Sequence, residues 1–183
     1  MNINKFTQKS MEAVQNCEKL AYEYGNQQIE QEHLFYSLLT LDDSLILKLL
    51  TKMGISKELI TNEAQQKLAG LPKVSGSSQV YISNDLNKVL INAEDESKAM
   101  GDEYVSVEHL FLSMLQYPNK EIKQIFTEYG ITRERFLQAL STVRGNQRVV
   151  SDNPEATYDT LEKYGQDLVE KARAQKLDPV IGR

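Results

Sequence analysis

The sequence predicts an all-α fold made of two copies of a four-helix repeat. Shifting the 183-residue chain against itself by 76 residues needs no gap and pairs 14 identical residues between 6–58 and 82–134. Average composition would give roughly three identities. In both copies, apolar residues recur at steps of three and four, with glycine and proline at the joints. We therefore expect a tandem duplication packed about an approximate two-fold axis.

The first copy, about residues 6–70, divides into four predicted helices. Their approximate limits are 8–24, 32–41, 45–53 and 57–68. Thr7 and Ser56 stand before helices, where a side-chain hydroxyl can accept a hydrogen bond from a free backbone N–H group. Gly25 and Gly54 stand after helices, where glycine can take the left-handed backbone conformation that ends them.

The second copy, about residues 82–144, repeats this order of elements. Its predicted N-caps and helix stops are Ser83, Ser106 and Thr132, and Gly101 and Gly130. No stretch of either copy has the alternating apolar pattern that predicts a convincing strand. Residues 1–144 are accordingly expected to form one domain of two helical repeats, joined by a loop over 70–78.

The helical pattern lapses after the second copy. Residues 145–152 are polar with a glycine at their start, which is typical of a mobile linker. A further helix is predicted to open at Asn153-Pro154-Glu155, which has the order of N-cap, first-turn proline and first-turn acid. Its apolar side has no visible partner in the sequence, so 153–183 is expected to begin a second, truncated unit.

Composition excludes several classes of function. The formal net charge is −5, from 26 acidic and 21 basic residues, which argues against nucleic acid as a partner. No apolar run approaches the roughly 18 residues of a membrane span, so no membrane partner is expected. The lone cysteine, Cys17, cannot form an intramolecular disulfide, and a reducing, cytoplasmic location is predicted.

The residues do not assemble an enzyme. No glycine precedes a lysine, so a phosphate-binding P-loop is missing and this chain should bind no ATP. Cys17 lies on the predicted core face of the first helix and is expected to be buried. The duplicated pairs Glu32-His33 and Glu108-His109 have metal-ligating side chains, but neighbours on a helix point about 100° apart, so no metal is expected. These acids instead suit the positive ends of their helices.

The doubled pattern of Gly25 and Glu32-His33-Leu34, repeated as Gly101-Asp102 and Glu108-His109-Leu110-Phe111, resembles the Clp amino-terminal repeat domain of Hsp100 AAA+ ATPases. The resemblance covers about the first 145 residues. Beyond them, the Leu161-Glu162-Lys163-Tyr164-Gly165 segment and the final Leu-Asp-Pro-Val-Ile-Gly-Arg resemble the entry to the first AAA+ module in the disaggregase branch of that family. Residues 153–183 would be the start of that module.

This resemblance implies a substrate-binding domain that captures unfolded or aggregated polypeptide for AAA+ modules outside the chain. ATP and magnesium would be cofactors of those modules alone, and the full-length ATPase would form a homohexamer that works with an Hsp70-type system, although this fragment would be monomeric. Family residues linked with substrate handling map onto Thr7, Leu90, Asp102 and Glu108. Each also has a structural explanation, as a cap, a core leucine, a loop acid and a helix-dipole partner respectively.

A second hypothesis is a docking platform. In relatives that supply the ClpP protease, acids matching Glu32 and Glu108 belong to sites for adaptor proteins or phosphorylated arginine. This chain keeps both acids but has Gln31 and Val107 before them, where those relatives usually have another residue. General capture predicts weak contacts with many clients, whereas docking predicts one or two defined, salt-sensitive sites.

Overall fold

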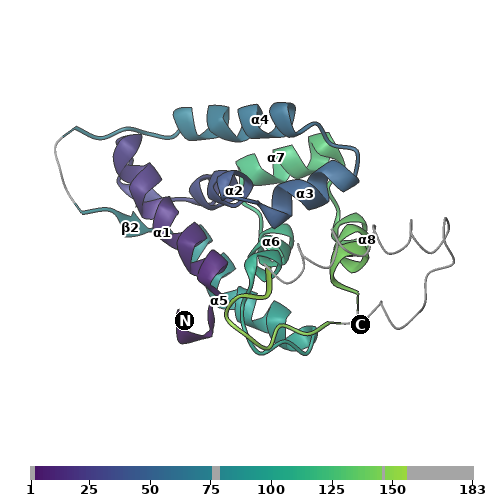
Figure 1. Cartoon of the computed structure of the whole chain (residues 1–183). Coiled ribbons are helices and arrows are strands. Elements are labelled where there is room, and N and C mark those ends of the chain that lie inside the picture. Colours follow the sequence, from purple (N-terminus) through teal and green to yellow (C-terminus); the bar gives the residue numbers. More distant parts are fainter. Residues whose placement is uncertain (1–2, 76–78, 146, 156–183) are drawn as a thin grey trace, which may run out of the picture.

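The computed structural model describes residues 3–75, 79–145 and 147–155. Within them the chain forms a short 3-10 helix, η1 (Ile3–Lys5), and eight α-helices (Figure 1). The helices are α1 (Gln8–Glu23), α2 (Gln31–Thr40), α3 (Leu45–Lys52), α4 (Lys57–Ala69), α5 (Asn84–Ala99), α6 (Val107–Gln116), α7 (Lys120–Tyr129) and α8 (Arg133–Arg144). The all-α prediction and the duplicated order of four helices are confirmed.

Helix boundaries follow the predicted capping residues. The Thr7 hydroxyl accepts a hydrogen bond from the backbone N–H of Ser10 at 3.2 Å, and Ser83 does the same for Leu86 at 3.1 Å. Beyond the ends of α1 and α5, Gly25 and Gly101 have φ of +70° and +72°. A side chain at either position would strain the backbone, so the glycines fix where these helices stop.

Two very short strands depart from the expectation of helices alone. Strand β1 (Gln28–Ile29) pairs in parallel with β2 (Tyr81–Ile82), and Phe6 forms an isolated bridge with Val105. These contacts are related by the repeat, because a shift of 76 residues turns Phe6 into Ile82 and Ile29 into Val105. In each repeat, the segment before the first helix therefore pairs with a segment of the other repeat. That partner segment lies just before the other repeat's second helix.

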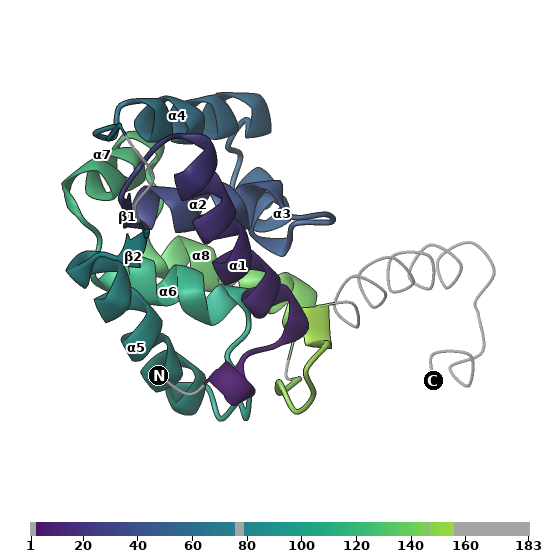
Figure 2. The ribbon, with the colours of Figure 1, turned by 90° about the vertical axis from the view of Figure 1, so that its left-hand side faces the viewer.

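The core lies where the two repeats meet. Helices α2 and α6 are central, and eight of the ten residues in each are buried. Helix α1 packs on α2 as α5 packs on α6 (Figures 1 and 2). Phe35 of α2 stacks on Phe111 of α6, its counterpart in the other repeat, with ring centroids 6.3 Å apart. Contact between equivalent side chains places them beside the approximate two-fold axis.

Candidate functional site

Each repeat builds the start of its second helix around a buried histidine. In repeat one, Nδ1 of His33 accepts a hydrogen bond from the Glu30 backbone N–H at 2.8 Å, and Nε2 donates to Oδ1 of Asn26 at 2.9 Å. Burial lowers the pKa of His33 to about 4, which keeps the ring neutral. The histidine of this pair is thus a helix cap, and its nitrogens are both engaged.

Repeat two repeats this geometry with a charged partner. Nδ1 of His109 accepts from the Ser106 backbone N–H at 2.8 Å, and Nε2 donates to Oδ2 of Asp102 at 2.7 Å. Asp102 occupies the position that Asn26 has in repeat one. Burial disfavours its charged form, but hydrogen bonds from His109, Arg144 and the Val149 N–H outweigh burial and hold the pKa of Asp102 below its ordinary value.

Arg144 supplies the positive charge of this cluster. It ends α8 with a side chain only 3% exposed, forms an ion pair with Asp102, and places its NH1 3.2 Å from Oε2 of Glu108. The repeat shift pairs Arg144 with Leu68, an ordinary core residue of repeat one. One buried arginine therefore holds two buried acids, and this arrangement exists only in repeat two.

Residues 147–155, which we call the strap, run back over this cluster. The fully buried Val149 donates its backbone N–H to Oδ1 of Asp102 at 2.9 Å and accepts the N–H of Glu103 at 2.8 Å. Further along, the backbone oxygen of Asp152 accepts the N–H of Gln8 at 2.7 Å. The strap therefore contacts the start of repeat one and the loop between α5 and α6 of repeat two.

Glu155 ends the described part of the strap in a buried position. Its Oε2 accepts hydrogen bonds from the Thr7 hydroxyl at 2.9 Å and from the Val107 N–H, at the start of α6, at 3.2 Å. Burial and the neighbouring Glu108 raise the pKa of Glu155 to about 7, although hydrogen bonds from its own backbone, from Val107 and from Thr7 oppose the change. One oxygen of Glu108 and one of Glu155 have no hydrogen-bond partner among the described residues.

The structure brings together three of the four residues assigned to substrate handling. Thr7, Asp102 and Glu108 belong to one network, which Arg144 and Glu155 complete. Leu90 lies elsewhere, in the hydrophobic core, and is 1% exposed. All four side chains are buried: the strap hydrogen-bonds to Thr7 and Asp102 directly, whereas Leu90 is enclosed by the core. The prediction that 145–152 is mobile stays a prediction, and most of 153–183 lies outside the described residues.

The acid of the alternative docking site has a different setting in repeat one. Glu32 accepts a hydrogen bond from Nδ2 of Asn119 at 2.9 Å, and burial raises its pKa. It lines a cleft of about 330 Å³ with Lys67 of α4 and Glu121 of α7. Lys67 already pairs with Glu121 at 2.8 Å. Glu32 and Glu108 are thus equivalent in sequence, but Glu32 borders a cleft at the junction of the repeats, whereas Glu108 is fully buried.

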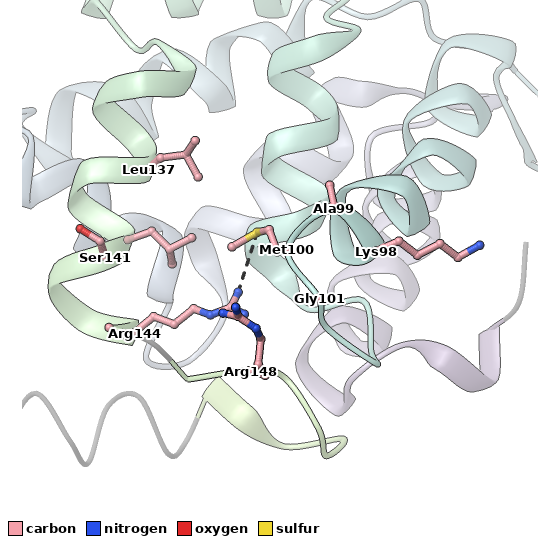
Figure 3. Close-up of a pocket in the computed structure, with 10 residues that line it drawn as sticks. Lys98, Ala99, Met100, Gly101, Leu137, Ser141, Arg144 and Arg148 are labelled. Atoms are coloured by element: carbon pink, nitrogen blue, oxygen red, sulfur yellow. Dashed lines mark hydrogen bonds between the residues drawn. The ribbon is translucent and has the colours of Figure 1, made fainter.

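A larger cleft of about 530 Å³ lies between the end of α5 and α8, close to the buried cluster (Figure 3). Its wall combines apolar side chains, including Met100 and Leu137, with Lys98 and Arg148. Figure 3 shows Arg144 reaching across the cleft toward Met100. Arg144 lines this cleft and also pairs with Asp102 and Glu108, so the cleft borders the buried cluster.

Other reactive groups are engaged in packing. Cys17 is buried in α1, and burial raises the pKa of its thiol, as expected for a core cysteine. Among the described residues, no three His, Cys, Asp or Glu side chains gather as metal ligands would. Over the same residues, no helix is long and apolar enough to cross a membrane.

Arg144 and Glu155 are the two members of the network that the sequence analysis missed. Extending the repeat alignment past residue 134 would have pointed to Arg144, because it pairs a charged residue with Leu68 on an apolar helical face. Glu155 was recognised only as a first-turn acid. Its contact with Thr7 spans 148 residues, and no local pattern encodes such a contact.

Two helical repeats related by a two-fold, each with a histidine-capped second helix, define a class of tandem-repeat helical domain. Residues 5–129 match the family of the Clp repeat (R) N-terminal domain, and the chain belongs to this family. Curated relatives carry the name chaperone protein ClpB. The protein from Nitratidesulfovibrio vulgaris is 44% identical over 188 residues, and one from Bacillus cereus is 41% identical over 187. Each alignment covers the whole of this chain but 22% of the relative, so the chain spans about a fifth of their length.

Solved structures have the same fold. The Hsp104 N-terminal domain from Candida albicans superposes with a TM-score of 0.73 at 22% identity, covering 82% of this chain and 99% of that one. The N-domain of ClpV, solved in complex with a VipB peptide, gives a TM-score of 0.60 at 20% identity, covering 76% of this chain and 86% of that one. The expected membership of the Hsp100 Clp amino-terminal repeat family is thus confirmed.

Proposed function

We propose that this chain is the substrate-binding N-terminal domain of a ClpB-type ATP-dependent disaggregase, which captures unfolded or aggregated polypeptide. The observation that carries the proposal is the 44% identity to a ClpB chaperone along the whole chain. A ClpV N-domain of the same fold is known in complex with a peptide, which supports polypeptide as the class of ligand. ATP and magnesium would act in AAA+ modules of the parent protein, in the cytoplasm, within a homohexamer assisted by an Hsp70-type system.

Capture by this domain requires binding and release of polypeptide, but no catalysed reaction. A domain that passes its substrate onward must also release it. Each single contact should therefore have a dissociation constant of about 1 μM or higher, which corresponds to a binding free energy no stronger than about −8 kcal/mol. Several tethered copies in one assembly would raise the local concentration and compensate for weak individual contacts. We assign substrate handling to Thr7, Asp102 and Glu108, with Leu90 supporting them from the core.

The alternative, a ClpC-like docking domain for adaptors or phosphoarginine, is favoured by the cleft beside Glu32. A carboxylate is the natural partner of a guanidinium group. At the equivalent position in repeat two, Glu108 already binds the guanidinium of Arg144 at 3.2 Å. The Glu32 cleft is therefore the better candidate for a defined site on this chain, with Glu108 as its internally occupied counterpart.

Amide NMR spectra of the 183-residue chain separate the two functions. We would add a reduced, carboxymethylated and therefore unfolded protein to one sample and free phosphoarginine to another, with Glu32→Gln as the control. Capture predicts graded shifts near Thr7 and Asp102 with the unfolded protein, and none with phosphoarginine. Saturable shifts around Glu32 with phosphoarginine that Glu32→Gln abolishes would overturn capture in favour of docking.

A further inference from the structure

Residues 147–153 of the strap are not helical and lie on the domain as a peptide ligand would, whereas Pro154 and Glu155 begin a helical turn. It makes backbone hydrogen bonds at two separate points: Val149 pairs with Glu103, and Asp152 accepts the N–H of Gln8. Its side chain at Val149 is fully buried, whereas the next residue, Val150, is 60% exposed. Among residues 147–153, Val149 is the buried one, so a single apolar side chain and the backbone hydrogen bonds anchor this part of the strap, as in the recognition of extended peptides.

The domain also recognises the end of the strap by charge and hydrogen bonding. Thr7 and the first N–H of α6 both donate to Glu155, at 2.9 and 3.2 Å. A helix N-terminus favours a carboxylate, and here it receives one from 48 residues away in the sequence. The surface beneath the strap thus offers an apolar site, backbone donors and a carboxylate site in line.

The fit is nevertheless imperfect. Glu155 lies beside Glu108, and each has a buried oxygen with no hydrogen-bond partner among the described residues. The guanidinium of Arg144 pairs with Glu108 there, and it also pairs with Asp102. Buried polar atoms without partners cost free energy. Once Glu155 is ionised, the strap therefore remains bound through these contacts but carries a penalty from the adjacent Glu108 carboxylate.

We propose that the surface formed by Thr7, Asp102, Glu103 and Val107 is a binding site for an extended polypeptide, and that the strap occupies it as an intramolecular competitor. A preferred ligand presents an apolar residue and, about six residues later, an acidic one, as Val149 and Glu155 do. Release of the strap uncovers the site, and binding of a client displaces the strap. This inference rests on the proposed function, since it takes polypeptide as the ligand.

Competition has a quantitative consequence. A site that is free in only a fraction of the molecules shows an apparent dissociation constant raised by the inverse of that fraction. If the strap is docked in about nine molecules of ten, its removal should tighten binding about tenfold. A charge placed at the buried position of Val149 should release the strap, because it would be desolvated next to Asp102. The same charge at the exposed Val150 should not.

The test compares Val149→Asp with Val150→Asp in the 183-residue chain. Circular dichroism checks that the helices persist, amide hydrogen exchange follows the N–H groups of Glu103, Val107 and Gln8, and fluorescence anisotropy gives affinity for labelled, reduced and carboxymethylated lactalbumin. We expect Val149→Asp to lose protection at these amides and to bind severalfold more tightly. Val150→Asp should match the parent chain in both measurements.

A second variant acts in the opposite direction. In Glu155→Gln, the amide oxygen can still accept from Thr7 and Val107, and the amide N–H can donate toward the unpartnered oxygen of Glu108. The strap should then dock more firmly and client binding should weaken at pH 8.

The outcomes separate this inference from the proposed function. Unchanged or weaker client binding by Val149→Asp, with its strap amides exposed, would overturn competition while leaving capture intact. Retained amide protection in Val149→Asp would contradict the docking itself. If neither the parent chain nor any variant binds the unfolded protein, the proposed function fails, whatever the strap does.

Discussion

The carboxyl group of Asp102 accepts hydrogen bonds from three groups, the side chains of His109 and Arg144 and the backbone N–H of Val149. Its counterpart in repeat one, Asn26, is neutral and accepts from His33. Both repeats thus have the histidine hydrogen bond at this position, but in repeat two it belongs to a buried ionic network. Buried ion pairs add little net stability while intact, yet they are costly to break because the remaining charge has no partner.

This asymmetry predicts the effect of replacing Arg144. Arg144→Leu introduces the residue that repeat one has at this position, but it leaves Asp102 and Glu108 buried without a cation. We expect a loss of about 3–5 kcal/mol in the free energy of unfolding, measured by urea denaturation. Arg133→Leu, on the same helix, removes a partly exposed pair with Glu96 and should cost less than about 1 kcal/mol.

A double variant checks the cause of that loss. Asp102→Asn combined with Arg144→Leu recreates the neutral chemistry that Asn26 and Leu68 form in repeat one. It should recover part of the stability that Arg144→Leu loses, so the two substitutions should be strongly non-additive. Additive losses would show that Arg144 stabilises the domain by packing alone.

Glu155 provides a prediction for pH. Its pKa is about 7 when the strap is docked, against 4.5 for an ordinary glutamate. The docked state therefore holds its proton more tightly, so docking is strongest below pH 4.5, weakens as the pH rises to about 7 and then levels off. Carboxyl NMR shifts should titrate with a midpoint near 7, and Glu108→Gln should lower it. A midpoint near 4.5 would mean that Glu155 is solvated.

At the scale of elements, the sequence predicted the helices well because their limits depend on local chemistry. The hydroxyl caps at Thr7, Ser56, Ser83 and Thr132 all start helices as expected. The short strands escaped notice because two-residue pairs leave no alternating pattern. The placement of the strap also could not be predicted, since it depends on contacts between residues such as Gln8 and Asp152 that lie far apart in the sequence.

The start of α2 carries its own pH dependence. The pKa of His33 is lowered from 6.5 to about 4 by burial, so as the pH falls the unfolded chain takes up the proton first. This histidine stabilises the fold fully above pH 6.5, and its contribution, up to about 3 kcal/mol, is lost as the pH falls to 4.

His33→Gln tests this dependence. Glutamine at this helical position can still accept the hydrogen bond from the Glu30 N–H group, but it does not titrate. Unfolding free energies measured from pH 4 to 7 should rise less steeply for His33→Gln than for the parent chain. Equal slopes would place the titrating group elsewhere.

At the scale of the molecule, the repeats depend on each other. The backbones of the two repeats pair with each other at Phe6–Val105 and at Ile29–Ile82. The side chains of Phe35 and Phe111 stack in a core that both repeats form. The duplication, the fold class and the family were predicted because the two copies align at a constant spacing of 76 residues and repeat the same motif. The buried network of Asp102 and Glu108 was not, because it depends on the positions of Arg144 and the strap, whereas Leu90 is buried as an ordinary core leucine.

This shared core predicts a single cooperative unfolding transition for the domain. Phe35→Ala in repeat one and Phe111→Ala in repeat two should each lower the unfolding free energy by about 3–5 kcal/mol. Each should shift the far-ultraviolet and tyrosine signals together. Leu59→Ala, at a side chain 60% exposed, should stay within about 0.5 kcal/mol of the parent. Two separate transitions would mean that the repeats fold independently.

The central claim is that polypeptide binds where the strap now lies. The most direct measurement is amide hydrogen exchange of the 183-residue chain with and without a saturating amount of an unfolded protein, followed at Val149, which belongs to the strap, and at Leu49, which is buried in α3. The account predicts that bound client speeds exchange at Val149, because the strap is displaced, and leaves Leu49 unchanged. Unchanged or slower exchange at Val149 with client bound would contradict it.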